Sequence, residues 1–215
     1  LESEKLGAKF FGFVKSNEVY DIFIQGPDFF QSKKSNINFN SFVHGAELKS
    51  YEFNLYKTKK KNKIINFNIN RKDIVKKKKK LDPILSGVNF TRDLVSEPGN
   101  ILHPDEYAKR LLPLKKLGIK VTVYDKKKLK KLGCNALLGV GQGSVRGSYL
   151  VTMEWNGTKS KSKPLAFVGK GVCFDTGGYS LKPARFMEDM TYDMAGSAAV
   201  VGLIKTLALR KAKVN

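Results

Sequence analysis

The sequence predicts an α/β protein made of two units. Apolar runs rich in β-branched and aromatic residues alternate along the 215 residues with segments whose apolar positions recur at helical spacing. A run of lysines at residues 76–80 separates a first group of these segments from a second group and marks a break in composition. An apolar fraction of 41% is typical of a globular protein with a buried core, and it excludes a disordered chain.

The first unit, residues 1–80, is predicted to be a small α/β domain. Residues 10–24 hold two apolar, β-prone runs around Ser-Asn, a pattern typical of a β-hairpin. Asn40 or Ser41 is expected to cap a helix, and the alternation of INFNI at residues 65–69 predicts a strand.

Residues 81–98 are predicted to form a linking helix, because Asp82 is a suitable N-cap residue and Pro83 then occupies the first helical position. Residues 99–215 are predicted to form a second α/β unit with a parallel or mixed sheet covered on both faces, because its strands alternate with helices. The expected elements are a helix at 105–117, a strand at 119–124, a helix at 125–133, strands at 148–155 and 165–169, and a helix at 194–210.

The net charge of +21 is concentrated in two lysine-rich stretches. Residues 57–80 hold 12 basic residues against one acidic residue, and residues 109–131 hold 10 against one, so the rest of the chain is close to neutral. Such stretches can bind nucleic-acid phosphates nonspecifically and in a salt-sensitive way. They have few interleaved aromatic residues for base stacking, which favours solvated surfaces instead.

Cysteine usage and hydropathy indicate a cytoplasmic setting. The two cysteines, Cys134 and Cys173, are not spaced as a disulfide framework or as a zinc site. No stretch of 18 or more apolar residues and no signal-like leader occurs, so no membrane partner is expected.

Two glycine-rich runs lack the spacing of nucleotide-binding motifs. GVGQGS at residues 139–144 misses the third glycine of a dinucleotide fingerprint, and VGKGV at residues 168–172 has no glycine five residues before Gly169 to form a phosphate loop. We interpret these glycines as positions where the backbone turns tightly beside a sheet.

Four polar residues follow the expected buried strand at residues 165–169. They are Lys170, Asp175, Lys182 and Asp193. Open α/β sheets bind their ligands at the carboxyl ends of their strands, and Asp193 also precedes an Ala-rich helix whose dipole favours an anion. The sequence therefore predicts a ligand site here.

The residue types at this site favour a divalent metal ion. Two converging carboxylates, Asp175 and Asp193, repel each other unless a cation lies between them, and their hard oxygens suit a dication. Lys170 can join as a neutral amine, whereas a protonated Lys182 can polarise a carbonyl and stabilise an oxyanion. The structural alternative is that the two aspartates are a turn residue and an N-cap residue and that both lysines are solvated.

These residues lie in stretches that resemble the cytosolic leucyl aminopeptidases, the M17 family of two-metal exopeptidases. The similarity lies in VGKGVCFDTGG, SLKP and MEDMTYDMAGSAAV, and it extends more diffusely into GVNFTRDLVSEPGN, NALLGVGQGS and the amino-terminal unit. The resemblance implies a small N-terminal α/β domain, a linking helix and a C-terminal α/β metallopeptidase domain with a mixed sheet, assembled as a cytoplasmic homohexamer.

The resemblance also implies a role for each site residue. Lys170, Asp175 and Asp193 match ligands of two divalent metal ions, zinc or manganese, with magnesium as a further option. Lys182 matches the catalytic lysine, and Met190 matches a wall of the pocket for the substrate's first side chain, which Lys182 and Asp193 also contact. The implied reaction is hydrolysis of an N-terminal residue, leucine or a similar one, from peptides with a free N-terminus by a metal-activated hydroxide.

One departure from the family pattern concerns the metal site. The family completes this site with an Asp-x-Glu-x-x-Arg stretch that does not occur in the sequence. We therefore expect the 215 residues to be a piece of a longer enzyme, with both domains incomplete, and to be inactive by themselves. A non-catalytic scaffold, or a nucleic-acid binder that uses the lysine-rich stretches, is the alternative.

Overall fold

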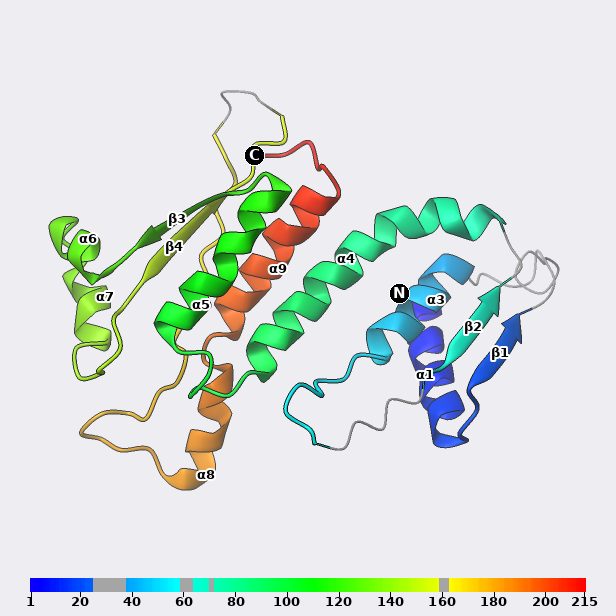
Figure 1. The fold of residues 1–215 in the computed structure, drawn as a ribbon, viewed down its shortest axis with the longest axis horizontal. Coiled ribbons are helices and arrows are strands. Elements are labelled where there is room, and N and C mark those ends of the chain that lie inside the picture. The colour runs from blue at the N-terminus through cyan, green and yellow to red at the C-terminus, as the bar shows by residue number, and fades with distance from the viewer. Residues whose placement is uncertain (25–37, 59–63, 70–71, 159–162) are drawn as a thin grey trace. The chain divides into compact units, whose positions relative to one another are not determined.

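The computed structural model divides the chain into two compact units, Leu1–Leu85 and Ser86–Asn215 (Figure 1). The structure describes residues 1–24, 38–58, 64–69, 72–158 and 163–215. The domain limits predicted from the sequence, at residues 80 and 98, stay predictions.

In its described residues, the first unit holds helices α1 and α3, a pair of strands and the beginning of helix α4 (Lys72–Ser96). In chain order the elements before α4 are α1 (Glu2–Ser16), β1 (Asp21–Ile24), α3 (Phe39–Lys49) and β2 (Asn66–Ile69). The strands pair in parallel, with Asp21 opposite Asn66 (Figure 1). The predicted strand at residues 65–69 is therefore confirmed, with β2 starting one residue later.

The predicted hairpin at residues 10–24 is wrong, because its first half belongs to α1. The buried residues of α1 are Ser3, Gly7, Phe11 and Val14. Their spacing of four, four and three residues places them on one face of a helix, and this period outweighs the β propensity of the aromatic run. The N-cap of α3 also lies earlier than predicted, since the Asn38 side chain accepts a hydrogen bond from the Ser41 backbone N–H.

Helices α1 and α3 pack with their backbones in close contact at two glycines. A Cβ atom on Gly7 would lie 1.8 Å from the carbonyl oxygen of Phe42, and one on Gly45 would lie 2.0 Å from the carbonyl oxygen of Glu4. No side chain fits at either position. Beside this contact, Phe42 packs with Phe39, Val43 and Phe10 to form the apolar core of the unit.

The helix predicted at residues 81–98 is part of a longer helix, α4 (Lys72–Ser96). Asp82 and Pro83 do not start the helix, because Pro83 lies inside it. Lysine has a high helix propensity, so the lysine run that marks a break in composition does not break the backbone helix.

The second unit holds the remaining helices and an antiparallel pair of strands. Its elements are α5 (Pro104–Leu111), η1 (Leu112–Leu117), β3 (Lys120–Tyr124), α6 (Lys126–Lys131), α7 (Asn135–Val140), β4 (Leu150–Glu154), α8 (Ala184–Met187), η2 (Glu188–Tyr192) and α9 (Ala195–Leu209). Lys120 pairs with Glu154 and Tyr124 with Leu150. The helices and strands expected at 105–133, 148–155 and 194–210 are confirmed, although the end of the first helix is a 3-10 helix at η1.

The strand predicted at residues 165–169 is not formed. The structure gives these residues no strand assignment, and Leu165, Phe167 and Val168 are 73%, 57% and 98% exposed. An apolar run becomes a central strand only if strands lie on both sides of it, and the β3–β4 pair does not extend to this segment.

The core of the second unit lies between α9, the end of α4, α5 and the β3–β4 pair (Figure 1). Helices α4 and α9 cross at two glycines: a Cβ atom on Gly202 would lie 2.0 Å from the Thr91 Oγ1 atom, and one on Gly87 would lie 2.0 Å from Thr206 Oγ1. The buried residues of the core include Leu94, Leu102, Leu111, Met194 and Val201.

One apolar stretch, residues 184–209, has the length and composition of a membrane span. It comprises three successive elements, α8, η2 and α9, and it includes Asp189 and Asp193. Helix α9 buries Ala198 and Val201 in the core of the second unit, so we interpret its apolar character as that of a core helix.

Candidate active site

The segment that carries Lys170 runs against the start of α9. The backbone N–H of Ser197 donates a hydrogen bond to the carbonyl oxygen of Lys170 at 2.9 Å. A Cβ atom on Gly169 would lie 2.5 Å from the Cα atom of Ser197 and 2.6 Å from the carbonyl oxygen of Gly196. This contact requires glycine at position 169, and it brings Lys170 next to the residues that precede α9.

Two ion pairs join the four polar residues that the sequence singles out. Lys170 Nζ lies 2.8 Å from Asp193 Oδ1, and Lys182 Nζ lies 2.9 Å from Asp175 Oδ2. The first pair joins residues 23 positions apart in the chain and therefore depends on the tertiary contact at Gly169. The second pair joins residues seven positions apart within one loop.

The two pairs also act on each other. The hydrogen bond from Lys182, together with the backbone N–H of Gly177, lowers the pKa of Asp175, and the charge of Lys170 lowers it further. The hydrogen bond to Asp193 raises the pKa of Lys170, and the charge of Asp175 adds to this effect. All four groups therefore belong to one electrostatic cluster.

The loop between Asp175 and Lys182 is a tight turn. Asp175 Oδ1 accepts a hydrogen bond from the backbone N–H of Gly177 at 2.8 Å, and the Lys182 N–H donates to the Thr176 carbonyl at 3.0 Å. Gly177 and Gly178 have φ values of 92° and 74°, which favour glycine. Asp175 thus fulfils the turn role of the structural alternative and still keeps its other oxygen for Lys182.

Met190 lies beside the lysine of this loop. Its sulfur is 2.9 Å from Lys182 Nζ, and both side chains are half-buried. Met190 lies in the 3-10 helix η2, and Asp193 is the C-cap residue of this helix, so a short local element presents both to the same site. The contact places an apolar, polarizable side chain next to the ammonium group.

Asp193 is not the N-cap of α9. Met194 occupies that position and makes no side-chain cap, so the structural alternative does not explain Asp193. Its Oδ1 atom pairs with Lys170, while its Oδ2 atom is buried and has no hydrogen-bond partner in the described part of the chain. A buried carboxylate oxygen without a partner is costly, and a metal ion is one group that would satisfy it.

The donor set of the site fits a divalent metal in part. Carboxylate oxygens of Asp175 and Asp193 and the amine of Lys170 are available, and the free Oδ2 atom of Asp193 supports such a site. Within the described ranges, however, no group of three or more His, Cys, Asp or Glu side chains is close enough to hold an ion. The cluster of Asp175, Asp193 and Lys170 therefore has donor types that suit a dication, but it is not a complete metal site in the described part of the chain.

Sequence reasoning missed two residues that position the site. The Tyr107 hydroxyl lies 3.0 Å from Ser197 Oγ, and Ser197 in turn donates its backbone N–H to Lys170. Burial raises the pKa of Tyr107 to about 12, so the hydroxyl stays protonated. The signal in the sequence was the run of small residues AGSAA at the start of α9, which permits close approach of another segment.

The structure describes all of the lysine-rich stretch at residues 109–131 but only part of the one at residues 57–80. Much of the stretch at residues 57–80 lies outside the described residues or has side chains that are not described. The stretch at 109–131 runs from α5 to α6, and most of its lysines are exposed. Nonspecific nucleic-acid binding by these stretches stays a prediction.

A comparison of the chain with models of protein families identifies its family. A model of the cytosol aminopeptidase family, catalytic domain, peptidase family M17, matches residues 89–215. The chain belongs to this family. The match includes all four residues of the electrostatic cluster as well as Met190, and it confirms the resemblance on which their roles were inferred.

Relatives and solved structures agree with this membership. The chain is 52% identical over 185 residues to a probable cytosol aminopeptidase of Phytoplasma mali, covering 81% of this chain and 37% of the relative. It is 51% identical over 179 residues to one of Afipia carboxidovorans, covering 80% and 36%. The chain thus spans little more than a third of these relatives' length.

Among solved structures, the cytosol aminopeptidase from Coxiella burnetii matches with a TM-score of 0.72 and 28% identity, covering 82% of this chain and 37% of that one. The bottromycin maturation enzyme BotP in complex with Mn matches with a TM-score of 0.77 at 24% identity, covering 96% and 44%. The second likeness shows the fold alone. Together they confirm a mixed α/β fold of the M17 aminopeptidase type.

Proposed function

We propose that this protein is the part of a metal-dependent aminopeptidase that carries its catalytic lysine and some of its metal ligands. The enzyme removes an N-terminal residue, leucine or a similar one, from peptides with a free N-terminus. The observation that carries the proposal is the buried, unpartnered Oδ2 atom of Asp193 within a cluster of two carboxylates and two lysines. Membership of the M17 family supports the same function.

Asp175, Asp193 and Lys170 would hold two divalent ions, zinc or manganese, with magnesium as a further option. When bound, such ions activate a water molecule and polarise the substrate carbonyl. The ammonium groups of Lys170 and Lys182 now neutralise the two carboxylates that a dication would neutralise. Lys170 has to release a proton from Nζ before it can act as a ligand, and its 61% exposed side chain gives that proton access to water.

Lys182 is proposed to be the electrophile. Its 29% exposed side chain keeps the ammonium group at the edge of the cluster, where it can donate a hydrogen bond to the carbonyl oxygen of the substrate as negative charge develops there. The Met190 sulfur beside it would form a wall of the pocket for the substrate's first side chain. Asp193 is proposed to contact the substrate as well, and the cytoplasmic homohexamer of the family is proposed for the whole protein.

Metal dependence is tested first on the full-length protein. We expect hydrolysis of leucine p-nitroanilide to be lost after dialysis against a chelator and to return with Mn²⁺ or Zn²⁺. Activity that persists at full rate after the chelator has removed all metal would contradict the proposal.

Measuring the bound metal distinguishes the proposed catalytic lysine from a proposed metal ligand. Lys182→Ala should lower kcat by roughly a hundredfold or more while bound metal stays unchanged, as loss of an oxyanion donor does. Asp175→Ala should lose both activity and metal. Lys116→Ala, an exposed lysine on η1, serves as the matched control and should keep both. Loss of metal in Lys182→Ala would reassign that residue as a ligand.

A further inference from the structure

A second candidate site lies away from the cluster described above, between α6, α7 and the loop that follows α7. It is a pocket of about 280 Å³. Its lining residues are Lys126, Lys130, Asn135, Leu138, Gly139, Gly141, Gln142, Arg146, Gly147 and Ser148. Pockets that hold drug-sized molecules have volumes of roughly 300–1,000 Å³, so this volume, just below that range, suits a smaller ligand. The glycine-rich run at residues 139–144 forms one side of it, a feature that aminopeptidase activity does not explain.

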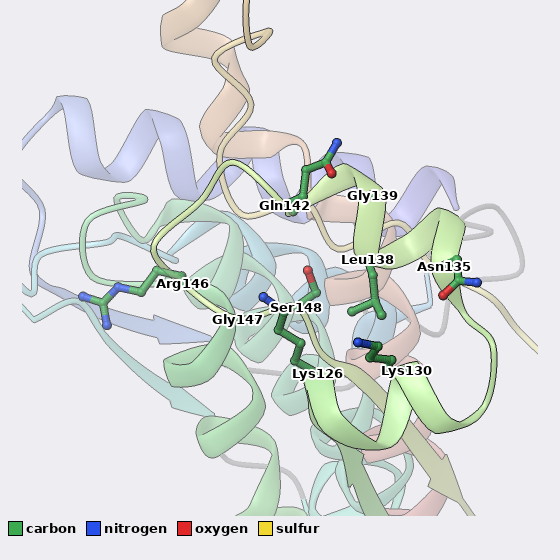
Figure 2. A pocket seen from close by; sticks show the side chains of 10 residues that line it. Lys126, Lys130, Asn135, Leu138, Gly139, Gln142, Arg146, Gly147 and Ser148 are labelled. Carbon is green, nitrogen blue, oxygen red and sulfur yellow. The ribbon is translucent and has the colours of Figure 1, made fainter.

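The pocket is cationic and polar. It has no acidic lining residue, and it holds the side chains of two lysines of one helix face, Lys126 and Lys130. Figure 2 shows both rising from α6 toward the side of the pocket that Leu138 and Ser148 form. Like charges four residues apart on a helix repel each other, so an anion between them would remove an unfavourable interaction.

The lysines of α6 differ in their partners. Lys128 Nζ donates a hydrogen bond to the Val123 carbonyl at 3.3 Å. Lys126 and Lys130 form neither an ion pair nor a side-chain hydrogen bond with any residue that the structure describes. The two ammonium groups that face the pocket therefore keep their donors available to a ligand, and it is their position at the pocket that distinguishes them from the other exposed lysines of α6.

Ser148 and Arg146 complete the rim in different ways. A Cβ atom on Gly141 would lie 2.2 Å from Ser148 Oγ, so glycine at this position lets the hydroxyl stay at the pocket. Arg146 lines the pocket, but its guanidinium points away from the lysines (Figure 2) and lies 3.3 Å from Asp105 Oδ2. We therefore count Lys126, Lys130 and Ser148 as donors and Arg146 as part of the wall.

We propose that this pocket binds the phosphate group of a small anion. A phosphate presents several strong acceptor oxygens to two ammonium groups and a hydroxyl, and the charge-assisted hydrogen bonds to lysine are the strong ones. Asn135 and Gln142 also line the pocket, although Figure 2 shows the Gln142 amide pointing away from the two lysines. The inference is independent of the proposed peptidase function, because none of the lining residues belongs to the cluster of Lys170 and Asp193.

Titration calorimetry on the full-length protein at constant ionic strength tests the proposal, with inorganic phosphate, glycerol phosphate and succinate as probes. We expect one saturable site for phosphate or for glycerol phosphate. Tighter binding of glycerol phosphate identifies a phosphorylated small molecule as the ligand, and equal or tighter binding of phosphate identifies the free ion. Succinate that binds as tightly as phosphate would overturn the assignment of a phosphate group, and so would the absence of saturable binding.

Two pairs of substitutions in α6 that remove the same charge distinguish phosphate binding in the pocket from general attraction to the basic helix. Lys126→Gln with Lys130→Gln should weaken phosphate binding at least about tenfold, as loss of two charge-assisted hydrogen bonds predicts. Lys127→Gln with Lys131→Gln removes the same charge from residues that do not line the pocket and should leave the affinity within about twofold. Equal weakening by both pairs would show diffuse attraction and overturn the site. Ser148→Glu, which adds a carboxylate at the rim, should abolish binding while leaving leucine p-nitroanilide hydrolysis unchanged.

Discussion

The two units of the chain each hold a pair of helices that cross at glycines, but the obstacles at the two crossings differ. In the first unit, a side chain on Gly7 or Gly45 would meet only backbone atoms of the opposite helix. In the second unit, a side chain on Gly87 or Gly202 would first meet the hydroxyl of a threonine and then a backbone carbonyl. A backbone contact can be relieved only by moving a whole helix, whereas a side-chain contact can be removed by mutation.

The second crossing also bears on the candidate active site. Thr91 Oγ1 donates a hydrogen bond to the Ala198 carbonyl at 3.0 Å and lies 3.1 Å from the Gly87 carbonyl. Ala198 stands one residue after Ser197, which anchors Lys170. The α4–α9 crossing therefore fixes the first turn of the helix against which the site is built, while the α1–α3 crossing stabilises its own unit.

The largest effect is expected for Gly7→Ala. The new Cβ atom would lie 1.8 Å from the Phe42 carbonyl oxygen, so α1 and α3 must separate. A contact with backbone atoms at this distance is expected to cost about 3 kcal/mol, the upper end of the 1–3 kcal/mol typical of overpacking, and the higher helix propensity of alanine recovers about 1 kcal/mol, which leaves a net loss of about 2 kcal/mol. Hydrogen exchange of the α1 and α3 amides, measured by mass spectrometry, should become about thirtyfold faster.

The matched control for this prediction lies in the same helix. A Cβ atom on Gly12 would have nothing within 4 Å, so Gly12→Ala should slow the exchange of α1 slightly through helix propensity alone. If Gly7→Ala behaved like Gly12→Ala, the backbone contact would not exist in solution.

A smaller effect is expected for Gly202→Ala, because part of its obstacle is a side chain. The Cβ atom would lie 2.0 Å from Thr91 Oγ1 and 2.6 Å from the Gly87 carbonyl oxygen. We expect a loss of about 1.5 kcal/mol in urea unfolding, followed through the fluorescence of Trp155, the single tryptophan. Combined with Thr91→Ala, the total loss should be smaller than the sum of the two single losses, because the new methyl group then no longer meets the Thr91 hydroxyl. Additive losses from the two substitutions would contradict the proposed contact.

The smallest effect is expected for Thr91→Val, which keeps the shape of the side chain and removes the hydroxyl. Loss of the hydrogen bond to the Ala198 carbonyl should cost about 1 kcal/mol in the same Trp155 assay. Thr91→Ser keeps the donor and should lose less than Thr91→Val. The reverse order would show that the methyl group of Thr91, rather than its hydroxyl, stabilises the crossing.

The sequence predicted the fold correctly in segments where the apolar residues follow one clear period, that of a helix or that of a strand. Helix α9, strands β2 and β3 and the short helix after Asp125 were predicted from apolar spacing, capping residues and the stop at Gly133. The hairpin at residues 10–24 failed because aromatic residues with high β propensity occupy helical positions in α1. The strand at residues 165–169 failed because a strand exists only through its neighbours, which lie elsewhere in sequence.

The candidate site likewise has features that the sequence predicts and features that only the tertiary structure decides. The sequence by itself determined which residues are the candidates for the site, namely Lys170, Asp175, Lys182 and Asp193, and it determined the local turn that joins Asp175 to Lys182 through Gly177. Only the tertiary structure decided that Lys170 meets Asp193, because that contact depends on the close approach of Gly169 to the start of α9. The physical reason is range: turns and helix periods are encoded by neighbours in the chain, whereas contacts between distant segments depend on how helices pack.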